Sequence, residues 1–210
     1  MFFAQQIPPY SIEVFNFISV AVSIVLGLGL TCLLNDISRV IQNWNRVKLY
    51  WVHCIWVAVI IGLHFQLWYG FWIYHSVPRW TFLSFVGYML APALLFLIAD
   101  LLFPELVASE VDDQRFDLRT YYNSIHTPLF ATLSAYLITV TALTIFLKPS
   151  NEFPIVPMLC RLAGITCAVL AMIFRSEAVH GVLVIVVLAL FLLFVCTAHL
   201  QPLTLALLER

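Results

Sequence analysis

The 210-residue chain is 63% hydrophobic and 15% aromatic, whereas only 10% of its residues are charged and its net charge is -1. Soluble domains carry about 25% charged residues, so this chain has too few charges to cover a water-facing surface. Disordered chains are rich in charge and poor in aromatics, and nucleic-acid-binding proteins carry a basic excess, so both classes are excluded. The composition therefore predicts an all-α integral membrane protein whose main partner is the lipid bilayer.

Six segments of the chain are long and apolar enough to cross a bilayer, which takes about 20 residues in a helix. We expect one transmembrane domain over 1–210, with spans at residues 14–34, 48–76, 80–103, 118–147, 155–174 and 179–200. After the first span, four apolar residues recur at helical spacing, namely Ile37, Val40, Ile41 and Trp44. This pattern predicts a short interfacial amphipathic helix, so the expected fold is a six-helix bundle with one such helix.

The positions of Lys and Arg predict which way the bundle is oriented. The loops after the first, third and fifth spans hold most of the basic residues, namely Arg39, Arg46, Lys48, Arg115, Arg119 and Arg175. The opposite side holds Arg79, Lys148 and Arg210. Because cytoplasmic loops are enriched in Lys and Arg, we expect the first group in the cytoplasm and both termini outside, in a bacterial inner membrane.

The second span carries three histidines, His53, His64 and His75, at intervals of eleven residues. Eleven residues turn a helix about 20° beyond three full turns, so the three imidazoles share one face at depths about 16 Å apart. Trp68 follows His64 by one turn, and this pair resembles the histidine and tryptophan of the influenza proton channel, where imidazole carries protons and indole gates them. Asp100 lies near the cytoplasmic end of the third span.

These residues favour a small membrane channel or transporter, proton-conducting or pH-sensitive, that assembles as a homo-oligomer. On this hypothesis His64 binds the proton at mid-membrane and Trp68 gates the path. His53, His75 and Asp100 then form the ends of the path. The competing interpretation is that the two outer histidines are ordinary interface residues and that His64 makes a structural hydrogen bond.

Further polar residues lie within the fourth and fifth spans. Arg161 either reaches outward to the interface or faces the bundle, where it attracts anions or pairs with Glu152. Thr132, Tyr136 and Thr139 form a polar stripe along one face of the fourth span. Their hydroxyls either line an aqueous path or donate to the carbonyls of the preceding helical turn.

A second hypothesis is a haem-binding electron-transfer protein, because two histidines from facing helices can supply axial ligands. The candidates are His53, His126 and His180 at the cytoplasmic side and His75 and His199 at the outer side. Haem is the cofactor of this alternative alone; otherwise we expect no cofactor and no metal site.

A third hypothesis is a membrane sensor, interaction or assembly protein without transport activity. In that case the loops at residues 35–47 and 104–117 meet a cytoplasmic protein partner. The chain has no phosphate-binding glycine loop, metalloprotease helix or nucleophile elbow, so we assign no catalytic residues and expect no enzyme.

Overall fold

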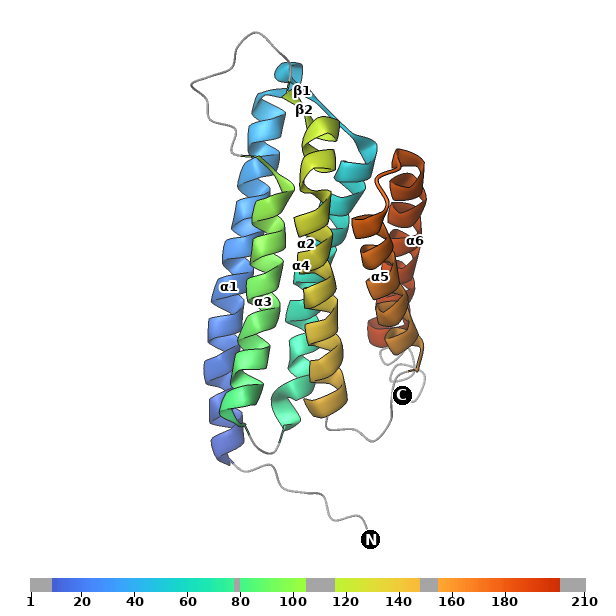
Figure 1. Cartoon of the computed structure of the whole chain (residues 1–210). Helices are drawn as coiled ribbons and strands as arrows, with labels where there is room; N and C mark the ends of the chain where they lie inside the picture. The colour runs from blue at the N-terminus through green and yellow to red at the C-terminus, as the bar shows by residue number, and fades with distance from the viewer. Residues whose placement is uncertain (1–8, 78–79, 105–115, 148–154, 201–210) are drawn as a thin grey trace.

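The computed structural model describes residues 9–77, 80–104, 116–147 and 155–200, which form six helices (Figure 1). Helices that follow one another along the chain run in opposite directions. The helices are α1 (Pro9–Gln42), α2 (Trp51–Phe71), α3 (Phe82–Leu102), α4 (Leu118–Leu147), α5 (Ile155–Ile173) and α6 (Glu177–Val195). All six are long and apolar enough to cross a membrane. The prediction of an all-α, six-span bundle is therefore confirmed, and the protein is membrane-embedded.

Short elements connect these helices at both ends of the bundle. They are η1 (Trp44–Arg46), β1 (Val47–Lys48), η2 (Trp72–Ser76) and β2 (Phe116–Asp117). A π-helical turn, η3 (Cys196–Leu200), follows directly on α6. The two strands pair in parallel, with Val47 opposite Phe116. This pairing ties the connection between α1 and α2 to the start of α4.

The first helix extends beyond its predicted range of 14–34 at both ends, and the larger difference is at the C-terminal end. Residues 35–42, expected as part of a separate interfacial helix, continue α1 without a break, and only Trp44–Arg46 forms a turn of its own. No Gly or Pro interrupts residues 30–42, and Arg39 pairs with Asp36 one turn earlier at 3.6 Å, which supports a continuous helix. With 34 residues, α1 is about 51 Å long, well beyond the hydrocarbon thickness of about 30 Å.

The six helices form a closed ring in the order α1, α3, α4, α5, α6 and α2. In addition, α2 contacts α3 and α4 and so lies nearest the centre. Large side chains such as Trp56, Tyr122 and Phe130 are buried between the helices, whereas Phe82 and Phe146 are about four-fifths exposed. The exposed apolar side chains face outward, as expected for helices in contact with lipid.

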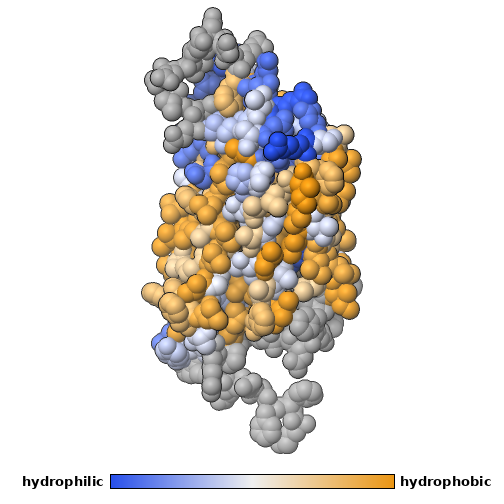
Figure 2. Space-filling model, in the orientation of Figure 1, coloured by the Kyte–Doolittle hydropathy of each residue, from blue (hydrophilic) through white to orange (hydrophobic). Residues whose placement is uncertain are grey.

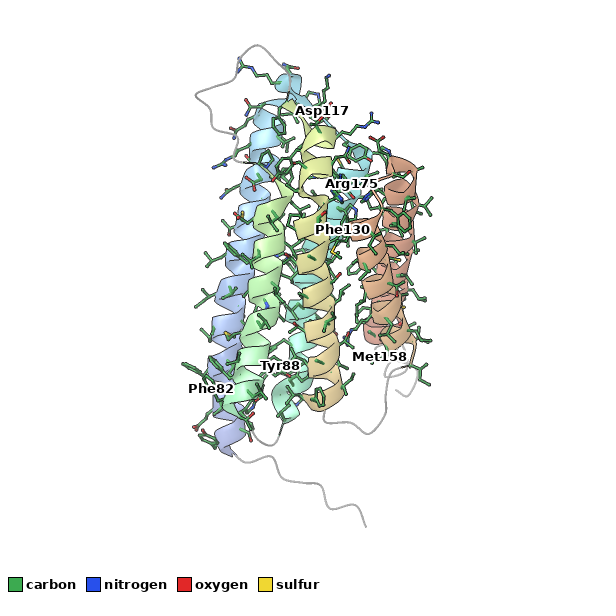
Figure 3. The ribbon with its side chains drawn as sticks, viewed as in Figure 1. Phe82, Tyr88, Asp117, Phe130, Met158 and Arg175 are labelled. Atoms are coloured by element: carbon green, nitrogen blue, oxygen red, sulfur yellow. The ribbon has the colours of Figure 1, made fainter. Side chains whose placement is uncertain are left out.

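The two ends of the bundle differ from its middle in polarity. We call the end with the connections α1–α2, α3–α4 and α5–α6 the connection end, and the end where α1 begins the terminal end. Asp117 and Arg175 lie at the connection end, whereas Phe82 lies at the terminal end (Figure 3). Figure 2 shows hydrophilic residues gathered at the connection end above a broad apolar band. At this end Arg119 of α4 forms an ion pair with Glu177 of α6.

A capping box begins α3. The Thr81 hydroxyl accepts from the Ser84 backbone N–H at 3.2 Å, and the Ser84 hydroxyl accepts from the Thr81 backbone N–H at 2.9 Å. Two N–H groups that the helix leaves without partners are thus satisfied. The cap holds the start of α3 beside the aromatic side chain of Trp80, which packs on Tyr88.

Thr81→Ala removes the side-chain cap, and we expect it to destabilise the protein by about 1 kcal/mol. In detergent micelles, the midpoint of thermal unfolding should fall by about 2–4 °C. Thr31→Ala is the matched control, because Thr31 lies exposed inside α1 and its hydroxyl donates only to the Gly27 carbonyl. Equal midpoints for the two variants would contradict a stabilising role of the cap.

Candidate functional site

A cavity of about 260 Å³ lies in the half of the bundle nearer the terminal end. Its lining includes residues from every helix, for example Val22, Gln66, Ala91, Val140, Arg161 and Phe194 for α1 to α6 in order. Tyr74 and Tyr88 also line it. We call this space the central cavity.

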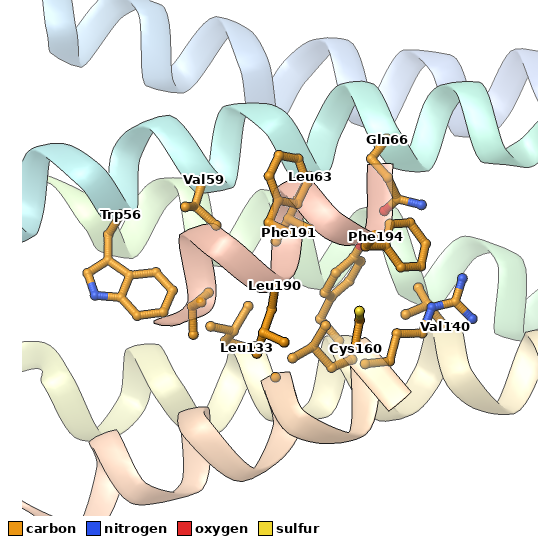
Figure 4. Close-up of a pocket in the computed structure, with 15 residues that line it drawn as sticks. Trp56, Val59, Leu63, Gln66, Leu133, Val140, Cys160, Leu190, Phe191 and Phe194 are labelled. Atoms are coloured by element: carbon orange, nitrogen blue, oxygen red, sulfur yellow. The ribbon is translucent and has the colours of Figure 1, made fainter. Parts of the chain in front are cut away.

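A smaller pocket of about 70 Å³ extends from the central cavity between α2, α4, α5 and α6. Gln66, Val140, Arg161 and Phe194 line both spaces and mark where the two meet. Apart from these residues, the pocket lining is mostly apolar. Figure 4 shows its side chains, with Leu63, Leu133 and Leu190 contributed by three different helices.

Arg161 faces the interior of the bundle at the junction of the two spaces. One guanidinium N–H donates to the Thr144 hydroxyl, and the guanidinium carbon lies 5.1 Å from the ring centroid of Phe194. No carboxylate of the described residues forms an ion pair with Arg161. Glu152, the partner considered from the sequence, lies outside the described residues. The structure thus places a cation inside the bundle, next to a cavity.

The polar stripe of α4 separates into two kinds of residue. The hydroxyls of Thr132 and Thr139 each donate to the carbonyl four residues earlier, at 2.8 Å. The backbone of α4 itself therefore provides the hydrogen-bond acceptors for these two hydroxyls. The side chain of Tyr136 is fully buried and lines the smaller pocket, and its hydroxyl has no hydrogen-bond partner among the described residues. Tyr136 is thus the member of the stripe that combines a place in the pocket lining with a hydroxyl that has no described partner.

His64 is buried between α2, α1 and α3, with 3% of its surface exposed. Its Nδ1–H donates to the Ile60 carbonyl at 2.8 Å, which leaves Nε2 as the bare nitrogen of the neutral ring. Nε2 faces Gly29 so closely that a Cβ atom at Gly29 would lie 2.7 Å away. Trp68, by contrast, is 61% exposed on the outer surface. Within one copy of the chain, the indole therefore lies outside the interior that holds His64.

Near the connection end the fold brings together His53 of α2, Tyr122 and His126 of α4 and His180 of α6, which we call the histidine cluster. The Tyr122 hydroxyl bonds to Nδ1 of His180 at 2.8 Å. The rings of His126 and His180 lie 5.9 Å apart, and those of His53 and Tyr122 lie 6.3 Å apart. Sequence reasoning grouped the three histidines but missed Tyr122, although its i, i+4 spacing to His126 places both on one face of α4.

The ring nitrogens of the cluster differ in their partners. Both nitrogens of His126 and His180 are hydrogen-bonded; the partners are Asn123 and Thr127 for His126, and Tyr122 and Phe174 for His180. Both nitrogens of His53 lack a partner among the described residues, and the ring packs edge-on against Phe103 at 5.1 Å. Among the described residues, no three His, Cys, Asp or Glu side chains are arranged to hold a metal ion.

Asp100 and His75 are not among the described residues that line the cavity. Asp100 is exposed, and its Oδ1 lies 3.9 Å from the Cys32 thiol, which also approaches Asp36 at 3.7 Å. His75 is exposed and stacks on Trp72, with ring centroids 5.3 Å apart. The side chain of His199 lies outside the described part of the structure.

No protein-family model, curated protein or solved structure matches this chain. Fold and site together define it as a six-helix membrane-embedded protein with a cavity lined by all six helices and buried histidines beyond that cavity.

Gly29→Ala is expected to destabilise the protein by about 1–3 kcal/mol, because the new methyl group must displace the His64 ring or move α1 away from α2. The measurement is thermal unfolding in micelles. Gly27→Ala is the matched control, because nothing lies within 4 Å of a Cβ at Gly27. That variant should be neutral or slightly stabilised, since Ala favours helix over Gly.

A double variant separates contact with His64 from general crowding. In a His64→Ala background, Gly29→Ala should cost clearly less, since the two positions are in direct contact. An undiminished cost in that background would show that the clash is with another part of the bundle, such as the Phe96 backbone, 3.4 Å from the same point.

Proposed function

We propose that this protein is a small membrane transporter or channel in which the central cavity holds a solute and buried histidines exchange protons. The observation that carries the proposal is the lining of the cavity by residues of all six helices. Helical transporters hold their substrates between helices, within the membrane, and alternate access by moving helices around that site. A cavity that every helix lines is suited to this, since displacement of any helix alters it.

Two buried histidines of α2, His64 and His53, lie at successive levels from the cavity toward the connection end. The residues of α3 and its C-cap that lie beside them give these levels. Ala91 lines the cavity, Phe96 lies at the level of His64, and Phe103 packs on His53. These steps of five and seven residues correspond to about 7.5 Å and about 10 Å along the helix. His64 thus lies between the cavity and the histidine cluster, to which His53 belongs, and this order supports both histidines as proton-binding positions of the path.

His64 is suited to proton exchange because its bare Nε2 can accept a proton while Nδ1–H remains bonded to Ile60. The contacts given for its two ring nitrogens are with Ile60 and Gly29, and neither residue bears an ionisable side chain. An ionisable residue buried in a membrane span is costly and favours a functional role. A gating role for Trp68 requires a homo-oligomer, in which a neighbouring copy covers the exposed indole.

The orientation and setting are part of the same proposal. The connection end faces the cytoplasm of a bacterial inner membrane, and both termini face outward. The basic residues described at that end support this; they are Arg39, Arg46, Lys48, Arg119 and Arg175. A haem function gains no support, because both nitrogens of His126 and His180 already have partners within the protein.

His64→Gln keeps a polar side chain of similar size but cannot titrate. In proteoliposomes with a pH gradient, we expect it to lower proton flux by about 100-fold, the lower end of what positioned proton-transfer groups contribute. Phe65→Ala is the control, because Phe65 is the adjacent residue and is exposed on the outer surface. Size-exclusion chromatography checks the fold of both variants. Unchanged flux in folded His64→Gln protein would remove His64 from the path.

A further inference from the structure

We infer that the ligand of the central cavity is a small monoanion with an apolar body, such as an aromatic monocarboxylate, and that its carboxylate binds Arg161. This inference deepens the proposed function and rests on the same cavity. It assigns the substrate class from the charge, the hydrogen-bond donors and the shape of the lining.

The charge of the lining points to an anion. Among the described residues that line the central cavity and the smaller pocket, Arg161 is the one ionised side chain, and none of them is Asp, Glu, Lys or His. A guanidinium taken out of water without a counter-ion is strongly unfavourable, and the face of Phe194 offsets only a small part of that cost. A bound monoanion would neutralise the charge, whereas a cation would add to it.

The donors favour a carboxylate. A guanidinium carries five N–H donors in a planar fork that matches the two oxygens of a carboxylate. Among the described residues, the Thr144 hydroxyl accepts one hydrogen bond from Arg161, so further N–H donors are left for a ligand. Tyr136 provides a second donor, because its buried hydroxyl lacks a partner among the described residues and its side chain lines the adjoining pocket. The Tyr74 hydroxyl lies 3.5 Å from Thr144 Oγ1 in the central cavity.

The shape and polarity of the remaining lining favour an apolar body. The central cavity measures about 260 Å³, and an apolar cavity of about 150 Å³ is enough to bind benzene. Away from Arg161, the lining is mostly aliphatic and aromatic, with Leu143 and Phe71 in the cavity and Leu133 and Phe191 in the pocket. A halide or phosphate ion would satisfy the guanidinium but leave this apolar surface unfilled.

Isothermal titration of benzoate into the full-length protein tests the inference, in a non-ionic detergent without anionic lipid. We expect saturable binding with one benzoate per chain. Benzyl alcohol, which has the same ring but no charge, should bind at least tenfold more weakly to the unmodified protein. This comparison needs no variant and therefore does not depend on whether any variant folds. Equal affinities for the two compounds, or no saturable benzoate binding, would overturn the inference.

Variants then locate the site. Arg161→Gln should weaken benzoate binding at least tenfold and Tyr136→Phe severalfold, whereas Arg175→Gln, an exposed arginine at the connection end, should leave the affinity unchanged. An equal loss in Arg175→Gln would assign the effect to surface charge and refute the site. Binding that appears only in Glu152→Gln would also refute it, because the protein's own carboxylate would then occupy the guanidinium.

Two more measurements separate ligand class from transport. Phosphatidylglycerol added to the same micelles should compete only weakly with benzoate. If the lipid binds the site more tightly than benzoate does, the site belongs to a lipid headgroup and the inference fails. Benzoate uptake into proteoliposomes tests the proposed function independently. Binding without uptake would support the ligand class and contradict transport, and uptake of a neutral solute without benzoate binding would do the reverse.

Discussion

A bilayer offers no hydrogen-bond partner to a polar group inside it, and this constraint governs where the polar side chains of the bundle lie. Hydroxyls within the spans donate to the carbonyl of the preceding turn, as Thr132 and Thr139 do. Arg119, which has a carboxylate partner in Glu177, lies at the polar connection end. His53 and Tyr136 depart from this pattern, because their buried polar atoms have no partner among the described residues. Arg161 is the charged residue that departs from it, since the described structure gives it one hydroxyl and one aromatic ring. The cavity lies next to this incompletely satisfied cation.

The sequence predicts the number of helices because length and apolarity are local properties, but it predicts their limits less well. The first span, expected over 14–34, is helical over Pro9–Gln42, and the second, expected over 48–76, is α-helical over Trp51–Phe71. The fourth span agrees with its prediction at both ends, Leu118–Leu147. The end of α1 does not, and the reason is physical. Apolar residues at helical spacing favour an interfacial helix and the continuation of a span equally, and only the unbroken backbone to Gln42 distinguishes them.

Side-chain depth was predictable from sequence, whereas side-chain direction was not. Antiparallel spans fix which residues share an end of the bundle, so His53, His126 and His180 could be grouped in advance. Helical geometry relates His64 to Trp68, but it does not say which face of α2 turns inward. The close approach of His64 to Gly29 depends on the relative height of two helices, which no pattern within either helix records. The cavity itself arises from six helices together and has no local signature.

The position of α2 links the two parts of the proposed mechanism. Gln66 of this helix lines the cavity beside Arg161, whereas His64 faces α1 and α3 on another side of the same helix. A proton on His64 Nε2 therefore places charge against the backbone of Gly29 in α1, near Phe96 of α3. Relief of that charge requires water or a shift of α2 away from α1. Such a shift would also move Gln66 in the cavity lining, so coupling between proton and ligand would pass through the displacement of one helix rather than through direct contact.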